Sequence, residues 1–382
     1  MAKSLFWWIQ AQAIPLEKMA SQAGKTPRFG VQLVKMLPSF DNQLLADGSL
    51  LLLFASRPEQ MFLTESRCLL QAGQVSRMWI NDGEDKMADR PTIALLGPGA
   101  IGTTLAAVLH EAGRTPVLCG RTAHSTLTLR DDEKETVVPG PVLTETSSVS
   151  QPFDLVFVAV KTTQVADCAD WLSTLCDKNT VVCALQNGVE QKIQLEPYVN
   201  GASVVPSVVW FPAQREPDFS VWLRAKPRLT LPDEPQAKRV ADVLSPTRCA
   251  VELSTDFTSI AWRKLLQNAV AGLMVLANRR AGMFSRRDVT DLALAYLHEC
   301  LTVARAEGAI LDDSVPQEIL DVFHRAPADL GTSILADRQA NRPLEWEIRN
   351  GVIARYGRAH DIATPISEVL VPLLAAGSEG PG

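Results

Sequence analysis

One short glycine-rich segment constrains the fold of this chain more than any other feature. The segment Leu96-Gly97-Pro98-Gly99-Ala100-Ile101-Gly102 follows an apolar run at 92–96 and precedes a helical stretch at 103–112. In a strand–turn–helix unit, glycines spaced as G-x-G-x-x-G permit a tight turn, a close backbone approach to a pyrophosphate, and close packing of helix on strand. The helix N-terminus then offers free N–H groups to the anion. The six residues Gly97 to Gly102 therefore predict a dinucleotide-binding turn.

The pattern downstream of this turn predicts two domains of different class. Apolar runs of strand length at 115–119, 154–160 and 180–185 alternate with helical stretches, including one at 164–175. This alternation is typical of a parallel sheet covered by helices on both faces. Strands joined by proline-rich turns are expected at 204–211 and 219–231, and a long helical region follows residue 255. We predict an α/β dinucleotide-binding domain at 87–254 and an all-α domain at 255–377.

Residues 1–86 carry no clear period and no motif, although the apolar run at 49–55 is a candidate buried strand. We expect them to form an N-terminal extension of unknown structure, and the run at 49–55 is too short to span a membrane.

Four polar or glycine positions follow four of the predicted strands. These are Gly97, Arg121, Lys161 and Asn187, each within two residues of a strand end. Ligands of open α/β sheets bind beyond the carboxyl ends of the strands, so these residues should converge on one edge. A carboxylate at the second strand would hold the ribose of NAD, whereas this chain has Arg121 there. A guanidinium suits a 2′-phosphate, so the sequence favours NADP(H).

The helical region contributes further candidates. Lys264 and Asn268 lie one helical turn apart, and Ser333 opens a helical piece that contains Asp337. Glu345 and Arg349 are spaced for an i,i+4 ion pair. From spacing alone, an exposed helix face is the favoured interpretation for these charges.

Composition excludes several classes of protein. The chain has 37 basic and 43 acidic residues, a net charge of −6, which argues against a general nucleic-acid binder. Its seven cysteines are scattered without a Cys-x-x-Cys pair, and its five histidines form no zinc pattern. We expect a cytoplasmic protein without a metal site, membrane anchor or nucleic-acid partner.

Five motifs in register resemble the ketopantoate reductase (2-dehydropantoate 2-reductase) family. They are the glycine turn, Lys161-Thr-Thr-Gln164, Gln186-Asn187-Gly188, Trp262-Arg-Lys264-Leu and Glu345 with Asn350-Gly351. The resemblance covers about residues 91–376. It implies a Rossmann domain, a helical C-terminal domain, and NADPH-dependent reduction of a 2-keto acid, ketopantoate to pantoate on the route to coenzyme A. Expected partners are this small substrate and, as an open possibility, a second copy of the chain.

The resemblance also implies roles for individual residues. The glycine turn would hold the pyrophosphate, Arg121 the 2′-phosphate, and Lys161 and Gln164 would line the cofactor channel. Asn187 would lie beside the nicotinamide and orient the substrate. Lys264 would donate a proton to the ketone oxygen, and Glu345 would accept a hydrogen bond from a substrate hydroxyl. Asn268 and Ser333 would bind the substrate's polar groups.

The sequence departs from the family pattern at three places. Gly272 replaces a usual second asparagine, and Trp210 and Trp346 are bulkier than the residues expected there. These changes could reshape the pocket, so reduction of a more apolar 2-keto acid is an alternative. A non-catalytic NADPH-sensing protein is a second alternative, although a sensor does not need the proton donor Lys264.

Overall fold

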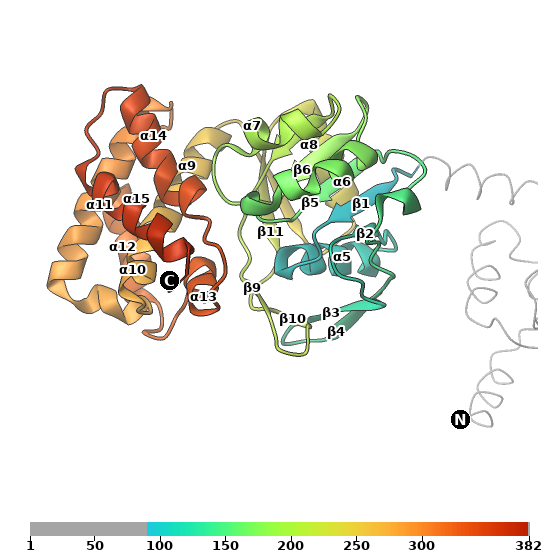
Figure 1. The fold of residues 1–382 in the computed structure, drawn as a ribbon, viewed down its shortest axis with the longest axis horizontal. Helices are drawn as coiled ribbons and strands as arrows, with labels where there is room; N and C mark the ends of the chain where they lie inside the picture. Colours follow the sequence, from blue (N-terminus) through green and yellow to red (C-terminus); the bar gives the residue numbers. More distant parts are fainter. Residues whose placement is uncertain (1–89, 381–382) are drawn as a thin grey trace, which may run out of the picture. The chain divides into compact units, whose positions relative to one another are not determined.

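The computed structural model describes residues 90–380 of the chain (Figure 1). The predictions made for residues 1–86, including the strand at 49–55, lie outside these residues and stay predictions. The domain boundaries at 87–254 and 255–377 also stay predictions. Among the described residues, no helix combines the length and apolar character that crossing a membrane requires.

A five-stranded parallel sheet forms the centre of the α/β part. Its strand order is β2-β1-β5-β6-β7. The strands are β1 (Ile93–Leu96), β2 (Val117–Cys119), β5 (Leu155–Val158), β6 (Val181–Ala184) and β7 (Ser203–Pro206). All neighbouring pairs are parallel, as the alternating sequence pattern predicts.

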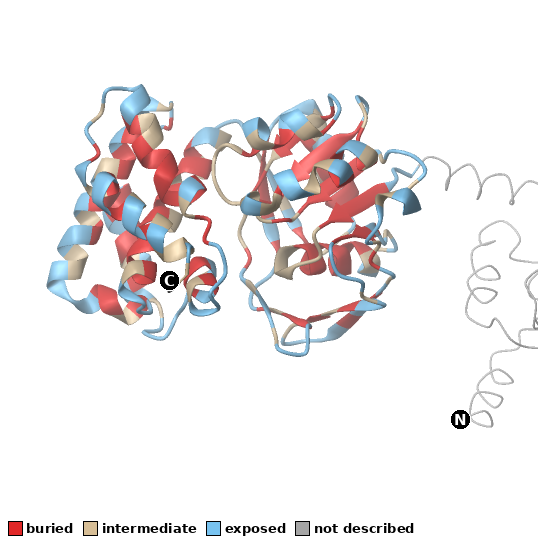
Figure 2. Cartoon of the chain, in the orientation of Figure 1, coloured by how far each residue is buried: buried red, intermediate tan, exposed pale blue. Residues whose placement is uncertain are grey.

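Both faces of this sheet are buried, and Figure 2 shows its strands in the colour of buried residues. Successive side chains of a strand point to opposite faces. In β1, Leu95 belongs to one apolar cluster and Leu96 to another. The first cluster includes residues of α5 (Ala100–Glu111) and α8 (Pro235–Leu244), and the second includes residues of α6 (Ala169–Leu175) and α7 (Gln191–Leu195). Burial on both sides explains why these strands are continuous apolar runs.

Two smaller sheets complete the α/β part. One has the order β4-β3-β10-β9 and the other β12-β11-β8. Their strands are β3 (Thr126–Arg130), β4 (Glu135–Pro139), β8 (Val208–Val209), β9 (Ala213–Arg215), β10 (Val221–Leu223), β11 (Arg228–Pro232) and β12 (Ala250–Ser254). No strand is predicted at 126–139 from the sequence, but β3 and β4 form an antiparallel hairpin there.

Helices dominate the remainder of the described chain (Figure 1). They are α9 (Phe257–Val270), α10 (Gly272–Ala277), η5 (Ala281–Ser285), α11 (Arg287–Ala306), α12 (Val315–Arg325), α13 (Ser333–Gln339), η6 (Glu347–Gly351), α14 (Val352–Ala359) and α15 (Pro365–Ser378). They enclose their own apolar core, which includes Trp262, Phe284 and Tyr296. The predicted fold class, an α/β dinucleotide-binding domain followed by an all-α domain, is confirmed.

Two predicted helices begin at other residues. Helix α5 begins at Ala100 rather than at 103, because Gly99 has an extended backbone and acts as its N-cap. The helix expected at 164–175 is an α-helix only from Ala169. Before it, the Lys161 N–H donates to Gln164 Oε1 and the Gln164 N–H donates to the Lys161 carbonyl, which closes the short 3₁₀ turn η2 (Thr162–Gln164).

Candidate active site

The glycine turn has the geometry that its sequence predicts. Gly97 has a φ of 91°, and a Cβ there would lie 2.6 Å from Val160 Cγ1. A Cβ on Gly102 would lie 2.3 Å from the Gly97 carbonyl oxygen. Both positions therefore require glycine. Gly97 needs it for its left-handed backbone and its close approach to Val160, and Gly102 needs it so that helix α5 can pack against the turn.

Gly99 lies in a different environment from these two glycines. A Cβ built on it would meet nothing within 4 Å. Helix α5 starts here with no side chain capping its N–H groups and no acidic residue in its first turn. An open backbone beside an uncapped helix N-terminus is suited to a phosphate group.

The glycine turn follows β1, the strand at which the strand order of the sheet reverses. Strand β1 pairs with β2 on one side and β5 on the other. Such a switch point leaves a crevice beyond the carboxyl ends of the strands. Gly120 and the exposed Arg121 follow the end of β2, and Pro98 packs against Gly120. Lys161 and Asn187 follow β5 and β6.

Lys161 contacts the helical part of the chain. Its ammonium pairs with Asp337 of α13, and Arg342 pairs with the same carboxylate at 2.9 Å. Asp337 is only 4% exposed, whereas Lys161 is half-buried. The sequence pattern locates Asp337 one helical turn after Ser333 but indicates no partner for it, so this ion pair is evident only from the tertiary structure.

Hydrogen bonds connect four of the predicted substrate and catalytic residues. Asn268 Nδ2 donates to Asn187 Oδ1 at 3.3 Å, and Asn187 Nδ2 donates to Glu345 Oε2 at 3.5 Å. Arg349 Nη2 donates to the same Glu345 oxygen at 3.2 Å and to Ser333 Oγ at 3.1 Å. Four side chains separated by as many as 158 positions therefore belong to one network that includes residues of both parts of the chain.

The prediction from spacing that Glu345 and Arg349 lie on an exposed helix face is wrong. Glu345 is 6% exposed and Arg349 is 2% exposed. Their i,i+4 ion pair does form, but it is buried together with the neighbouring apolar residues Leu344, Ile348 and Val352. Val352 packs into the helical core and Leu344 into a smaller apolar cluster. Sequence spacing identifies the pair and cannot distinguish an inner from an outer location.

Burial and ionic neighbours act in opposite directions on Glu345. Burial raises the pKa of its carboxyl group, but Arg349, through its charge and hydrogen bond, together with Lys161 and the Thr162 N–H, lowers it, and the combined effect is the larger one. The resulting pKa lies below the ordinary value, so Glu345 is a carboxylate at neutral pH.

Lys264 of α9 lies half-buried beside an aromatic ring. Its Nζ lies 5.0 Å from the centre of the Trp210 ring, and Arg228 lies over the same ring at 4.8 Å. Trp210 Nε1 donates to Thr230 Oγ1 at 2.9 Å, which orients the indole. Burial, followed by the charges of Arg349 and Arg228, lowers the pKa of Lys264 to about 8. A lysine in such an environment can release a proton near neutral pH.

The space left by Gly272 is filled by Asn350. A Cβ on Gly272 would lie 2.8 Å from Asn350 Nδ2. This amide is fully buried and donates to the Ala269 carbonyl and to Tyr296 Oη. The change from asparagine to glycine at 272 is therefore accommodated by packing.

The two unusual tryptophans have different surroundings. Trp346 packs beside an apolar cluster of helical residues that includes Ile334 and Leu344. Trp210 contacts Lys264 instead. Of the two, Trp210 is the one that can affect the environment of the proposed proton donor.

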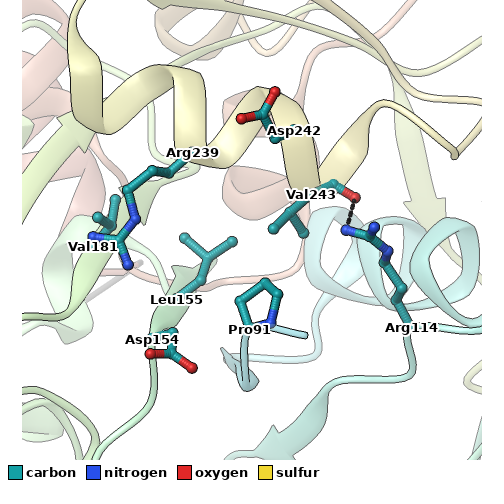
Figure 3. A pocket seen from close by; sticks show the side chains of 8 residues that line it. All are labelled: Pro91, Arg114, Asp154, Leu155, Val181, Arg239, Asp242 and Val243. Carbon is teal, nitrogen blue, oxygen red and sulfur yellow. Dashed lines mark hydrogen bonds between the residues drawn. The ribbon is translucent and has the colours of Figure 1, made fainter. Parts of the chain in front are cut away.

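Two cavities lie at opposite ends of the strands of the parallel sheet. A small one of about 10 Å³ is lined by residues that include Asn187, Lys264 and Asn268. A larger one of about 310 Å³ is lined by Pro91, Asp154 and Val181 among others (Figure 3). These residues lie at the amino ends of β1, β5 and β6, whereas ligands of such sheets bind at the carboxyl ends. We therefore assign the candidate active site to the smaller cavity and its surroundings.

Within residues 90–380, no three His, Cys, Asp or Glu side chains group closely enough to hold a metal ion.

Comparison with known proteins identifies the family. Residues 93–236 match the family model described as ketopantoate reductase PanE/ApbA, and residues 256–378 match the model of its C-terminal domain. A 2-dehydropantoate 2-reductase of Mycobacterium tuberculosis is 53% identical over 291 residues, which cover 76% of this chain and 99% of that protein. A protein of the same name from Caulobacter vibrioides is 33% identical and covers 75% of this chain and 98% of its own length.

Solved structures agree with these matches. A dimeric ketopantoate reductase from Staphylococcus aureus superimposes with a TM-score of 0.70 at 26% identity, covering 76% of this chain and all of that one. A PanE/ApbA family ketopantoate reductase from Ralstonia eutropha gives the same score and identity over 75% of this chain and 98% of its own. The resemblance inferred from five motifs is confirmed: this chain belongs to the ketopantoate reductase PanE/ApbA family, whose members are dinucleotide-dependent oxidoreductases.

Proposed function

We propose that this chain catalyses the NADPH-dependent reduction of 2-dehydropantoate (ketopantoate) to pantoate in pantothenate biosynthesis. One observation carries the proposal beyond family membership. Asn187, Asn268 and Lys264 line one cavity, and Glu345 and Ser333 join the same hydrogen-bond network. The site thus combines a cationic proton donor, amide groups and a carboxylate, which are the groups needed to bind and reduce a hydroxylated 2-keto acid.

The glycine turn and Arg121 fit NADPH. Gly97, Pro98, Gly99, Ala100, Ile101 and Gly102 would hold the pyrophosphate, because the backbone at Gly99 is open and the N-terminus of α5 is uncapped. Arg121 is exposed beyond β2 and would bind the 2′-phosphate, which NADH lacks. Lys161 and Gln164 would line the cofactor channel beyond β5. Bound NADPH would supply the hydride.

Lys264 would then serve as the proton donor. Reduction of a ketone leaves negative charge on its oxygen, which a nearby ammonium group stabilises and protonates. The lowered pKa of Lys264, about 8, keeps a substantial ammonium fraction at neutral pH while making proton release easier than from an exposed lysine. The ammonium would also attract the substrate carboxylate.

The amides and the carboxylate would orient the substrate. Asn187 and Asn268 border the same cavity as Lys264 and can bind the carboxylate or the ketone. Ser333 would bind a further polar group. Ionised Glu345 is an acceptor only, so it would favour a substrate that offers a hydroxyl.

The test follows NADPH oxidation by absorbance with purified full-length chain and a panel of 2-keto acids. We expect ketopantoate to be the best substrate, and Lys264→Ala to lower kcat/KM by about 10²- to 10⁴-fold while NADPH binding is retained. Tight NADPH binding without turnover of any keto acid would overturn the proposal and favour a sensor.

A different 2-keto acid is the second candidate, and the contact of Trp210 with Lys264 favours it. An indole beside the proton donor adds apolar surface to the site. Preference for a non-hydroxylated, more apolar keto acid in the same panel would support this candidate over ketopantoate.

We also propose a cytoplasmic location and a homodimeric state. The cysteines among residues 90–380 are free thiols, which suits a reducing compartment. The Staphylococcus aureus relative is described as dimeric. Light scattering on the purified chain would measure the oligomeric state.

A further inference from the structure

Arg349 is the largest fully buried side chain among the described residues, and it makes few hydrogen bonds. Its Nη2 donates to Ser333 Oγ and Glu345 Oε2, while its Nε is buried without a partner. Burying a guanidinium is unfavourable unless acceptors compensate for the lost water. Because burying this charge is unfavourable and its partners are Glu345 and Ser333, we expect Arg349 to have a role in the candidate active site.

The carboxylate of Glu345 depends on this neighbour. Its other hydrogen bonds are long: Thr162 N and Oγ1 donate to Oε1 at 3.4 and 3.3 Å, and Asn187 donates to Oε2 at 3.5 Å. None of these donors carries a charge. In a buried environment without a close cation, a carboxyl group takes up a proton. Arg349 is the cation in direct contact with Glu345, whereas Lys161 lowers the pKa of this carboxyl group without an ion pair to it.

We propose that Arg349 is a positioning residue that keeps Glu345 ionised and oriented towards Thr162 and Asn187, and thereby makes the enzyme selective for 2-keto acids that carry a hydroxyl. The inference rests on the proposed function. An ionised carboxylate only accepts hydrogen bonds, so a bound substrate without a hydroxyl leaves it desolvated and unpaired. A protonated Glu345 would have its own donor and would lose that discrimination.

Three variants test the role of charge. Arg349→Met removes the charge and keeps most of the side-chain volume, Arg349→Lys keeps the charge, and Glu345→Gln provides the neutral reference. Each is assayed with ketopantoate and with its analogue that lacks the hydroxyl, and the readout is the ratio of the two kcat/KM values. NADPH affinity and Tm check that each variant is folded.

We expect Arg349→Met to lower this ratio about 10-fold or more, the effect of losing a charge-assisted hydrogen bond. Arg349→Lys should retain most of the ratio. In the Glu345→Gln background, Arg349→Met should change the ratio no further, because each substitution by itself abolishes the negative charge at position 345.

Two results would overturn the inference. One is an unchanged ratio in folded Arg349→Met; the other is a further loss of the ratio when it is combined with Glu345→Gln. If Arg349→Met does not fold, Arg349→Lys decides, since a collapsed ratio with normal NADPH binding would show that charge is not the cause. Failure of the proposed function is separate, because wild-type protein would then fail to reduce ketopantoate.

Discussion

The ammonium group of Lys264 lies 5.0 Å from the centre of the Trp210 ring, and Arg228 covers the same ring at 4.8 Å. Lys264 lies in helix α9, whereas Trp210 directly follows strand β8 and Arg228 is the first residue of strand β11. The indole attracts the ammonium group, and the guanidinium opposes its charge. Burial and the charges of Arg349 and Arg228 lower the pKa of the proposed proton donor, and the Trp210 ring is the aromatic group beside it.

Removing the indole should impair the reaction without removing the cofactor site. We expect Trp210→Leu to lower kcat/KM by about 2- to 30-fold, the range of a cation–π interaction worth about 0.5–2 kcal/mol. Trp210→Phe keeps a ring and should retain most of the activity. Steady-state kinetics of both variants, with NADPH affinity as the control, check this. Equal losses in the two variants would show that the ring's charge distribution is unimportant.

The pH profile of kcat/KM should report the proton on Lys264. Its pKa is lowered to about 8, so activity should fall as pH rises through that value and the neutral amine replaces the ammonium donor. Arg228→Gln removes one of the two like charges that lower the pKa, and the alkaline limb should move to higher pH. Arg228→Lys keeps the charge and should leave the limb in place. The other charged groups nearby are Arg349, which also lowers the pKa of Lys264, and Glu252, which pairs with Arg228. A shift of the alkaline limb to lower pH in Arg228→Gln would contradict the electrostatic explanation.

Arg121 should decide between the two nicotinamide cofactors. Arg121→Gln removes a charged donor, so we expect NADPH to bind about 10- to 150-fold more weakly, the range of a charge-assisted hydrogen bond. NADH binding should change little, because it has no 2′-phosphate. Fluorescence titration with both nucleotides measures the difference. Parallel weakening of both would place Arg121 outside the 2′-phosphate site.

Two glycines of the same turn should respond differently to a methyl group. In Gly102→Ala the Cβ would meet the Gly97 carbonyl oxygen at 2.3 Å, so we expect a loss of about 1–3 kcal/mol in the free energy of unfolding. In Gly99→Ala the Cβ meets no protein atom within 4 Å, so stability should be retained while NADPH binding weakens. Urea unfolding and nucleotide titration on both variants separate the two effects. Normal NADPH affinity in Gly99→Ala would contradict a pyrophosphate at this position.

Local sequence was sufficient for the half of the candidate site that lies at the carboxyl ends of the strands. The glycine spacing, the apolar strands and the residues after each strand predict where Gly97, Arg121, Lys161 and Asn187 lie, because parallel strands end at a common edge. The start of α5 and the short turns before α6 differ by a few residues, since a backbone cap and a side-chain hydrogen bond determine them. The β3-β4 hairpin is missed because short half-buried strands leave a weak pattern.

The helical half of the site depended on tertiary contacts. Spacing pairs Glu345 with Arg349 but favours the outside of a helix, whereas packing of the adjacent apolar residues buries both. Likewise, nothing along the chain indicates that Asn350 fills the space at Gly272 or that Trp210 lies beside Lys264.

The sequence by itself determined the family, the fold class and the geometry of the glycine turn, because these depend on periodicity and on residue types at short spacing. Only the tertiary structure decided which charges are buried together and which face the cavity. Those properties arise from contacts between residues distant in the chain, where desolvation and neighbouring charge set the protonation of Lys264 and Glu345.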